Sequence, residues 1–133
     1  MGCPVAKVLV VDDNPVNLRV CRLILERYGH VVETETSPVA ALARMATQAP
    51  DLPDVLITDL MMPVLDGIEL TRQIRALPTG RDLPIIMLTA RGEESDQDRA
   101  MEAGATNFLT KPVSSGVLTT AVNDALDPPA ETR

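Results

Sequence analysis

Cysteines are few in this sequence, and long apolar runs and signal sequences are absent. The only two cysteines, Cys3 and Cys21, lack the spacing of paired metal ligands. No apolar run approaches the length of a transmembrane helix, and the first residues do not form a signal-peptide pattern. We therefore expect a domain of the reducing cytoplasm without membrane contact, in which Cys21 is a buried apolar side chain rather than a redox group.

Basic residues are also few, and they are scattered. The chain has 12 Lys and Arg against 19 Asp and Glu, which gives a net charge of −7. An acidic surface without a basic cluster lacks the electrostatic attraction that binding to nucleic acids or anionic membranes requires. We therefore expect no direct contact with nucleic acid.

Length and composition indicate one domain. A chain of 133 residues with 45% hydrophobic composition can build one core. Neither an internal repeat nor a low-complexity tract marks a second domain. The chain is expected to divide into an N-terminal extension at residues 1–6, a folded domain at residues 7–126 and a flexible tail at residues 127–133.

Apolar segments of two kinds alternate along the folded domain. Short β-branched runs predict strands, and segments with apolar residues three or four positions apart predict helices. Strands are expected at Lys7–Val11, His30–Thr34, Val55–Asp59, Pro84–Thr89 and Thr106–Thr110. Helices are expected from Pro15 to Gly29, from Ser37 to Ala46, from Ile68 to Leu77, between Gly92 and Gly104, and from about Val117 to Leu126.

The predicted helices differ in the apolar surface that they offer to a core. Asn14 or Asp13 is expected to cap the first helix, and the fourth helix should be the least firmly anchored because it has little to bury. The residues expected to be buried are Val16, Val20, Leu23 and Ile24 in the first helix, Ala100, Met101 and Ala103 in the fourth, and Leu118, Val122 and Ala125 in the fifth.

Five alternating strand and helix units predict an α/β fold. This fold is a doubly wound, five-stranded parallel sheet with helices on both faces and right-handed crossovers. Polar residues capable of chemistry follow the first, third, fourth and fifth strands but not the second. A strand order of 2-1-3-4-5 accounts for this, because a crevice then opens between the carboxyl ends of the first and third strands.

This topology brings five side chains to one edge of the sheet. Asp12 and Asp13 follow the first strand, Asp59 ends the third, Thr89 ends the fourth and Lys111 follows the fifth. Each has an ordinary explanation when taken alone, but three carboxylates at one edge repel one another and raise one another's pKa values. Lys111 supplies one compensating charge. Mg²⁺, which prefers oxygen ligands and keeps several waters, is expected to supply the rest.

Such a site predicts phosphoryl transfer. One metal position stays open to a phosphoryl oxygen, so Asp59 can attack phosphorus as a nucleophile. The metal, the Lys111 ammonium and the Thr89 hydroxyl would stabilise the phosphoryl oxygens. The predicted product is an aspartyl phosphate on Asp59.

The same residues form a set of motifs. They are Val11-Asp12-Asp13-Asn14, Asp59 followed by Met62-Pro63 and Asp66-Gly67, Thr89-Ala90, and Phe108 three residues before Lys111-Pro112. Together, from about Lys7 to Leu126, they resemble the receiver domain of two-component response regulators. The resemblance implies a flavodoxin-like receiver fold in which Asp59 accepts a phosphoryl group from the phosphohistidine of a histidine kinase or a histidine phosphotransfer domain.

The resemblance also implies a metal site. In such a site Asp13, Asp59 and the backbone carbonyl of Met61 bind Mg²⁺, and Asp12 holds the waters of the metal. The implied activity is limited to the domain's own phosphorylation and to slow self-dephosphorylation.

Signalling roles follow from the resemblance as well. Thr89 and Lys111 would contact the phosphoryl oxygens, and the bond between Lys111 and Pro112 would be cis, an isomer accessible to proline. Phe108 matches the switch aromatic of the family. Phosphorylation is then expected to alter the surface formed by the fourth helix, the fifth strand and the fifth helix.

Three other functions can be compared with this one. A dinucleotide-binding domain requires closely spaced glycines where this chain has Asp12-Asp13-Asn14-Pro15. A metal-dependent phosphatase that forms an aspartyl phosphate is the enzyme alternative, although Met61 stands where such phosphatases place a second acid. A simple interaction domain does not explain why the acidic residues, Thr89 and Lys111 all stand at strand ends.

The parent protein has two possible forms. The sequence contains no helix-turn-helix and no output enzyme, so the domain is either a stand-alone response regulator or a receiver from a larger protein. The segment Asp12–Asn17, together with Leu25 and Gly29-His30-Val31, resembles receivers of hybrid sensor histidine kinases. We expect that origin in preference to the stand-alone form.

Overall fold

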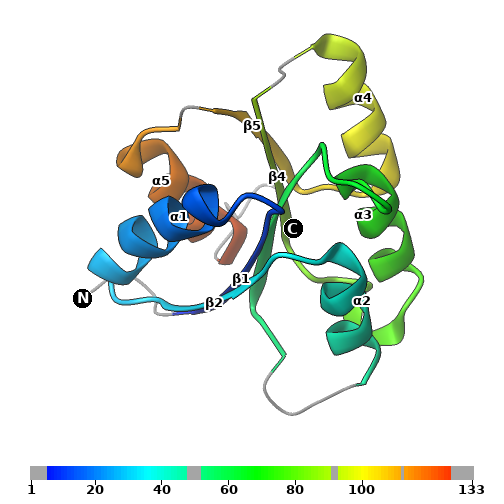
Figure 1. Ribbon diagram of the computed structural model, residues 1–133, viewed down its shortest axis with the longest axis horizontal. Coiled ribbons are helices and arrows are strands. Elements are labelled where there is room, and N and C mark those ends of the chain that lie inside the picture. Colours follow the sequence, from blue (N-terminus) through cyan, green and yellow to red (C-terminus); the bar gives the residue numbers. More distant parts are fainter. Residues whose placement is uncertain (1–5, 48–51, 91–92, 112, 127–133) are drawn as a thin grey trace.

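A five-stranded parallel sheet forms the centre of the protein (Figure 1). The computed structural model describes residues 6–47, 52–90, 93–111 and 113–126. The strands are ordered β2-β1-β3-β4-β5 and alternate along the chain with five α-helices. The predicted fold class and strand order are therefore confirmed.

The elements lie close to their expected positions. The strands are β1 (Lys7–Val11), β2 (Val31–Glu35), β3 (Val55–Asp59), β4 (Ile85–Thr89) and β5 (Asn107–Thr110). The helices are α1 (Pro15–Arg27), α2 (Pro38–Ala46), α3 (Gly67–Arg75), α4 (Glu94–Ala103) and α5 (Ser115–Leu126), with a short 3₁₀ helix, η1 (Pro78–Gly80), before β4. His30 was expected in the second strand but precedes it, because its backbone N–H donates to the carbonyl of Leu25 in the turn that closes α1.

Side chains alternate between the two faces of the sheet, so each central strand serves two cores. Helices α1 and α5 cover one face, and α2, α3 and α4 cover the other (Figure 1). Val8, Val10 and Ile57 point toward α1 and α5. Leu9 and Leu56 point toward α2 and α3. Burial on both faces explains the continuous apolar runs of β1 and β3.

Side-chain caps set the start of three helices. The Asn14 side chain accepts a hydrogen bond from the N–H of Val16 at 2.9 Å, so Asn14 rather than Asp13 caps α1. Ser37 caps α2 in the same way, and Asp66 caps α3. In each case the cap supplies an acceptor for an N–H group that the first helical turn leaves unpaired.

Helix α1 buries a different stripe from the one expected. Val16, Val20 and Leu23 are 66%, 48% and 58% exposed, so their predicted burial is wrong. The buried residues of this helix are Leu18, Cys21 and Leu25, with Ile24 partly buried against them. The helix carries two apolar stripes, and only one of them can face the sheet. Burial of Cys21 as an apolar side chain is confirmed.

The later helices follow expectation in part. In α4, Ala100 is buried as predicted, whereas Met101 is 44% exposed and Asp96, which was not expected inside, is only 2% exposed. In α5, Leu118 and Val122 are buried as predicted. Their neighbours Thr119 and Ala121 are buried as well, and Ala125 is partly buried.

Some predictions concern segments outside the described residues. These are the N-terminal extension apart from Ala6, the environment of Cys3, the tail at residues 127–133, and the isomer of the bond between Lys111 and Pro112. Within the described residues, no helix is long and apolar enough to cross a membrane.

Candidate functional site

Three carboxylates converge at the carboxyl ends of β1 and β3. These strands are parallel neighbours, with Val11 paired to Thr58, so Asp12 and Asp13 emerge beside Asp59. One carboxylate oxygen from each of the three residues lies within 4.8 Å of the others. Asp12 is buried, Asp13 is exposed, and Asp59 is intermediate. The arrangement follows from the strand order, since only adjacent strands place their ends this close together.

Lys111 contacts two of these carboxylates from the end of β5. Its Nζ lies 2.8 Å from Oδ2 of Asp12 and 3.7 Å from Oδ2 of Asp59. The backbone N–H of Lys111 donates to the carbonyl of Thr89 at 2.7 Å, which holds the start of the following loop against β4. The lysine therefore lies between the two acidic residues that come from different strands.

Burial raises the pKa of Asp59 above its ordinary value, and the charge of Asp12 raises it further. Lys111 and the backbone N–H groups of Leu60 and Met61 oppose this rise. The Leu60 N–H donates to Oδ1 of Asp59 at 2.8 Å. The raised pKa means that the protein alone does not fully compensate the charge of the ionised Asp59 carboxylate, which an added cation would stabilise.

The start of helix α3 packs closely against the backbone of Asp59 and Leu60. The N–H of Gly67 donates to the carbonyl of Leu60 at 2.9 Å. A Cβ atom at Gly67 would lie 2.2 Å from the carbonyl oxygen of Asp59, so no side chain fits there. Sequence analysis named Asp66-Gly67 as part of a motif but missed this packing requirement, whose signal is a glycine immediately after the helix cap.

Thr89 and Phe108 lie at different depths in the fold. Thr89 ends β4, next to β3 on one side and β5 on the other, and is fully buried. Phe108 is half-buried on β5 and packs in a third apolar cluster with Ile68, Met87 and Ala100, among others. This cluster connects the sheet to α3 and α4, so Phe108 packs where both helices meet the sheet.

The site residues thus form two groups: a charged cluster at the strand ends, and the pair Thr89 and Phe108 on β4 and β5. Asp12, Asp13, Asp59 and Lys111 are brought together by the contacts above. Met61 stands two residues after Asp59, the last residue of β3, and its side chain is exposed. Three converging carboxylate groups match the oxygen ligands that a hard divalent cation prefers, so these residues fit Mg²⁺.

Comparison with known proteins agrees with this geometry. The family model of the response regulator receiver domain matches residues 8–123. The response regulator PleD of Caulobacter vibrioides is 37% identical over 113 residues, which are 85% of this chain and 24% of PleD. An uncharacterised 14.6 kDa protein of Leptolyngbya boryana is 40% identical over 106 residues, which are 80% of this chain and 79% of that protein.

A solved structure shows the same fold in a related domain. The receiver domain of the sensor histidine kinase PA1611 from Pseudomonas aeruginosa, with a magnesium ion coordinated in its active-site cleft, is 33% identical. The match has a TM-score of 0.78 and covers 93% of this chain and 96% of that domain. Because the family model spans nearly all of the described core and relatives of this identity share its fold, the chain belongs to the response regulator receiver domain family.

Proposed function

We propose that this domain accepts a phosphoryl group on Asp59 from a phosphohistidine of a histidine kinase or a histidine phosphotransfer domain. The observation that carries the proposal is the contact of Lys111 with both Asp12 and Asp59 inside a cluster of three carboxylates. A lone strand-end Asp would need no such surroundings. A nucleophile that attacks an anionic phosphoryl group needs cations on both partners.

The chemistry is a single displacement at phosphorus. A carboxylate oxygen of Asp59 forms the new bond to phosphorus, and the bond from phosphorus to the histidine nitrogen of the donor breaks. The electron pair of the broken bond stays on the imidazole, which takes up a proton. Lys111 neutralises charge on the phosphoryl oxygens, and the Thr89 hydroxyl donates a hydrogen bond to one of them.

Mg²⁺ is the cofactor that we propose for this step. Asp13, Asp59 and the backbone carbonyl of Met61 would hold it, with Asp12 acting through bound water. When bound, the ion supplies positive charge that screens the nucleophile from the phosphoryl oxygens. The magnesium ion in the PA1611 receiver domain supports this assignment.

The surface next to the site supports a protein as the phosphodonor. Helix α1 begins immediately after Asp12-Asp13-Asn14 and exposes Val16, Val20 and Leu23. Exposed apolar side chains beside a reactive group are typical of a surface that another protein covers. A protein donor would bury this stripe on docking, whereas a small-molecule donor would leave it exposed.

The proposed acceptor can be tested directly. Incubation with phosphoramidate and Mg²⁺ is expected to add one phosphate that hydroxylamine removes, because a carboxylate nucleophile yields an acyl phosphate. The Asp59→Asn protein is the matched control, since it keeps the size of the side chain and should remain unmodified. Intact mass spectrometry distinguishes the results. Label that resists hydroxylamine, or that persists in Asp59→Asn, contradicts the mechanism.

The phosphatase alternative predicts a different result. A phosphatase needs a general acid near its nucleophile, and the residue two positions after Asp59 is Met61. We therefore expect slow loss of phosphate from the protein itself and no sustained turnover of p-nitrophenyl phosphate. Many turnovers per protein would favour the phosphatase.

For the parent protein, we propose a hybrid sensor histidine kinase. The sequence likeness at Asp12–Asn17 supports it, as does the similarity to a receiver of a sensor histidine kinase. This chain spans about a quarter of the length of PleD, whereas the match covers 79% of the 14.6 kDa protein of Leptolyngbya boryana. The second relative makes a stand-alone regulator the competing origin. The complete reading frame decides between them: a kinase segment in it supports the hybrid origin.

A further inference from the structure

We propose that a cavity between α1 and the ends of β4 and β5 binds an uncharged small molecule with an apolar body and one hydrogen-bond acceptor. The cavity has a volume of about 380 Å³. This lies within the range of about 300–1,000 Å³ that is typical of small-molecule sites. It lies beside the carboxylate cluster but is not lined by Asp12, Asp13 or Asp59 among the described residues.

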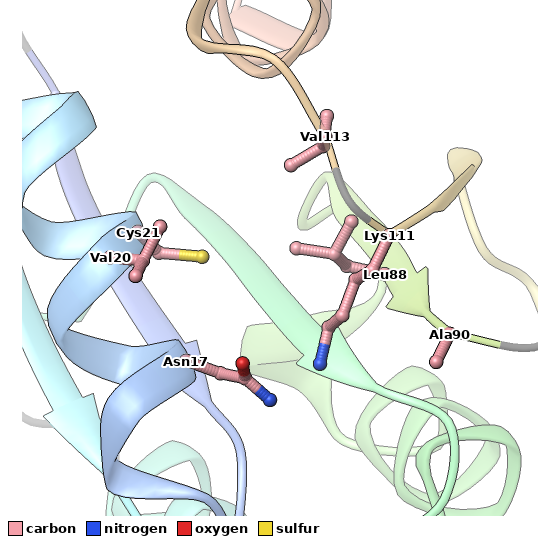
Figure 2. A pocket seen from close by; sticks show the side chains of 7 residues that line it. All are labelled: Asn17, Val20, Cys21, Leu88, Ala90, Lys111 and Val113. Carbon is pink, nitrogen blue, oxygen red and sulfur yellow. The ribbon is translucent and has the colours of Figure 1, made fainter.

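Most of the cavity wall is apolar. Val20 and Cys21 line it from α1, and Leu88 and Val113 line it from the opposite side (Figure 2). The sulfur of Cys21 points into the cavity. Burial raises the pKa of this thiol to about 11, so it stays neutral near pH 7 and acts as part of the apolar wall. A wall of this kind favours an apolar ligand body.

Two polar groups stand together at one end of the cavity. The carboxamide of Asn17 and the ammonium group of Lys111 point toward each other across the opening (Figure 2). Both groups can donate hydrogen bonds to a carbonyl or ether oxygen of a ligand. The other side chains that line the cavity in the described part of the chain offer no comparable donor, so a ligand would place its single acceptor at this end.

The charges of Lys111 and the neighbouring carboxylates favour an uncharged ligand. The Lys111 ammonium already lies 2.8 Å from Asp12 and 3.7 Å from Asp59, so its charge is largely compensated. A carboxylate ligand would therefore meet the repulsion of the acidic cluster without an available cation. A cationic ligand would have to lie against Lys111. An uncharged acceptor avoids both costs.

Lys111 links this cavity to the phosphorylation site. Its stem lines the cavity while its ammonium contacts Asp12 and Asp59. Occupancy of the cavity should therefore change the free energy of phosphorylation at Asp59, and phosphorylation should change the free energy of ligand binding. This coupling rests on the proposed function. Coupling between two ligands is reciprocal, so each must alter the affinity for the other by the same factor.

Coumarin is a suitable probe, because it is an uncharged bicyclic molecule with one carbonyl acceptor. In the full chain without Mg²⁺, titration with coumarin is expected to shift the amide signals of Val20, Cys21, Leu88 and Val113 in a saturable manner. Coumarin-3-carboxylate has nearly the same shape but carries a negative charge, and it is expected to bind at least about tenfold more weakly. Equal binding of both, or shifts confined to another surface, would overturn the proposal.

Filling the cavity provides the matched variant. Cys21→Met extends a side chain into the space and is expected to weaken coumarin binding about tenfold. Val16→Met makes a comparable enlargement on the same helix outside this cavity, and coumarin binding should be unchanged. Asn17→Ala, which does not enlarge a buried side chain, should also weaken binding because it removes a donor. Unaltered binding in both Cys21→Met and Asn17→Ala would show that the probe lies elsewhere.

The link to phosphorylation is measured separately. The dissociation constant of coumarin is expected to change severalfold when beryllofluoride and Mg²⁺ are added to the wild-type protein, and not in Asp59→Asn. Failure of beryllofluoride to bind would count against the proposed function, while coumarin binding in metal-free protein would still support the cavity. An unchanged constant in protein saturated with beryllofluoride would overturn the coupling.

Discussion

Asp12 and Asp13 are adjacent in sequence but differ in their surroundings. Oδ1 of Asp12 accepts from the N–H of Asn14 at 2.9 Å, and its Oδ2 lies 2.8 Å from Nζ of Lys111. Asp13 is exposed at the mouth of the cluster. Both oxygens of Asp12 therefore have partners already, which fits contact with a metal through water, whereas Asp13 is open to direct coordination.

This difference predicts unequal effects on Mg²⁺ affinity. Asp13→Ala should weaken binding by more than about 100-fold because it removes a direct ligand, and Asp12→Ala by about tenfold. Titration with Mg²⁺ measures both constants. Without metal, Asp13→Ala should also melt at a higher temperature than the wild type, because one of three repelling charges is gone. Wild-type affinity in both variants contradicts the site assignment.

His30 supplies a pH dependence at the opposite end of the sheet. Its side chain is buried, Nδ1 accepts a hydrogen bond from the N–H of Ala6 at 3.1 Å, and Nε2 has no partner within the described part of the chain. Burial lowers the pKa of this imidazole below its ordinary value of 6.5. Protonation would charge a buried ring and remove the acceptor of Ala6.

The sign of the effect follows from proton binding. Below pH 6.5 the unfolded chain binds a proton at His30 that the folded protein resists, so the free energy of unfolding decreases as the pH falls from 6.5 toward the lowered pKa. Urea unfolding at pH 7.5 and pH 5.5 should show a larger loss of stability in the wild type than in His30→Gln. Parallel losses in the two proteins would contradict this role of His30.

At the scale of elements, Arg75 joins α3 to the segments on either side of β4. Its Nε and Nη2 donate to the carbonyl of Gly104 at 3.0 and 2.7 Å, and Nη1 donates to the carbonyls of Gly80 and Leu83. Gly104 has a φ of +115° and follows the last turn of α4. Burial lowers the pKa of Arg75, yet the guanidinium remains charged at neutral pH and satisfies several backbone acceptors at once.

Loss of this guanidinium should therefore destabilise the fold and loosen α4. Arg75→Met is expected to lower the free energy of unfolding by about 1.5–3 kcal/mol, the usual range for hydrogen bonds to a charged group. Amide exchange near Gly104 should become faster. Arg72→Met is the control on the same helix, since its ion pair with Glu69 is exposed to solvent and should contribute much less to stability. Equal effects of the two substitutions would show that Arg75 is not a tie between elements.

The helices also show which structural features a sequence pattern can predict and which it cannot. The cap of α1 at Asn14 or Asp13 and the start of α2 at Ser37 were predictable, because a cap acts within four residues of the helix start. The cap of α3 at Asp66 was not predicted. The buried face of α1 was not readable, because Val16, Val20 and Leu23 form a stripe as apolar as the one that is buried. The choice between them depends on which side of the helix meets β1 and α5. That contact joins residues far apart in the chain.

At the scale of the whole molecule, the proposed phosphorylation of Asp59 would have to change a surface that a partner binds. Thr89 stands at the end of β4, next to β3, and Phe108 lies one strand further on, in the apolar cluster that includes Ile68 of α3 and Ala100 of α4. A phosphoryl oxygen that draws the Thr89 hydroxyl inward would leave space that Phe108 can fill. Because Phe108 has no hydroxyl, packing alone would hold the inward position.

This mechanism predicts that Thr89→Ala accepts phosphate but transmits the signal poorly. With beryllofluoride and Mg²⁺, the wild type should show altered amide shifts and hydrogen exchange across β5 and α4. Thr89→Ala should show much smaller changes there, although its beryllofluoride binding persists. Asp59→Asn is the control that should show neither. Equal responses of the wild type and Thr89→Ala would mean that another path carries the signal.

The sequence by itself determined the strands, the helices, their order in the sheet and the ends at which Asp12, Asp59 and Lys111 stand. These features depend on local periodicity, turn chemistry and the rules of parallel sheets. Only the tertiary structure decided that Lys111 contacts Asp12 more closely than Asp59, that Gly67 has no room for a side chain, and that a cavity lies beside the site. The physical reason is that the spacing between segments far apart in the chain is set by the packing of the whole core. A local sequence pattern carries no information about that packing.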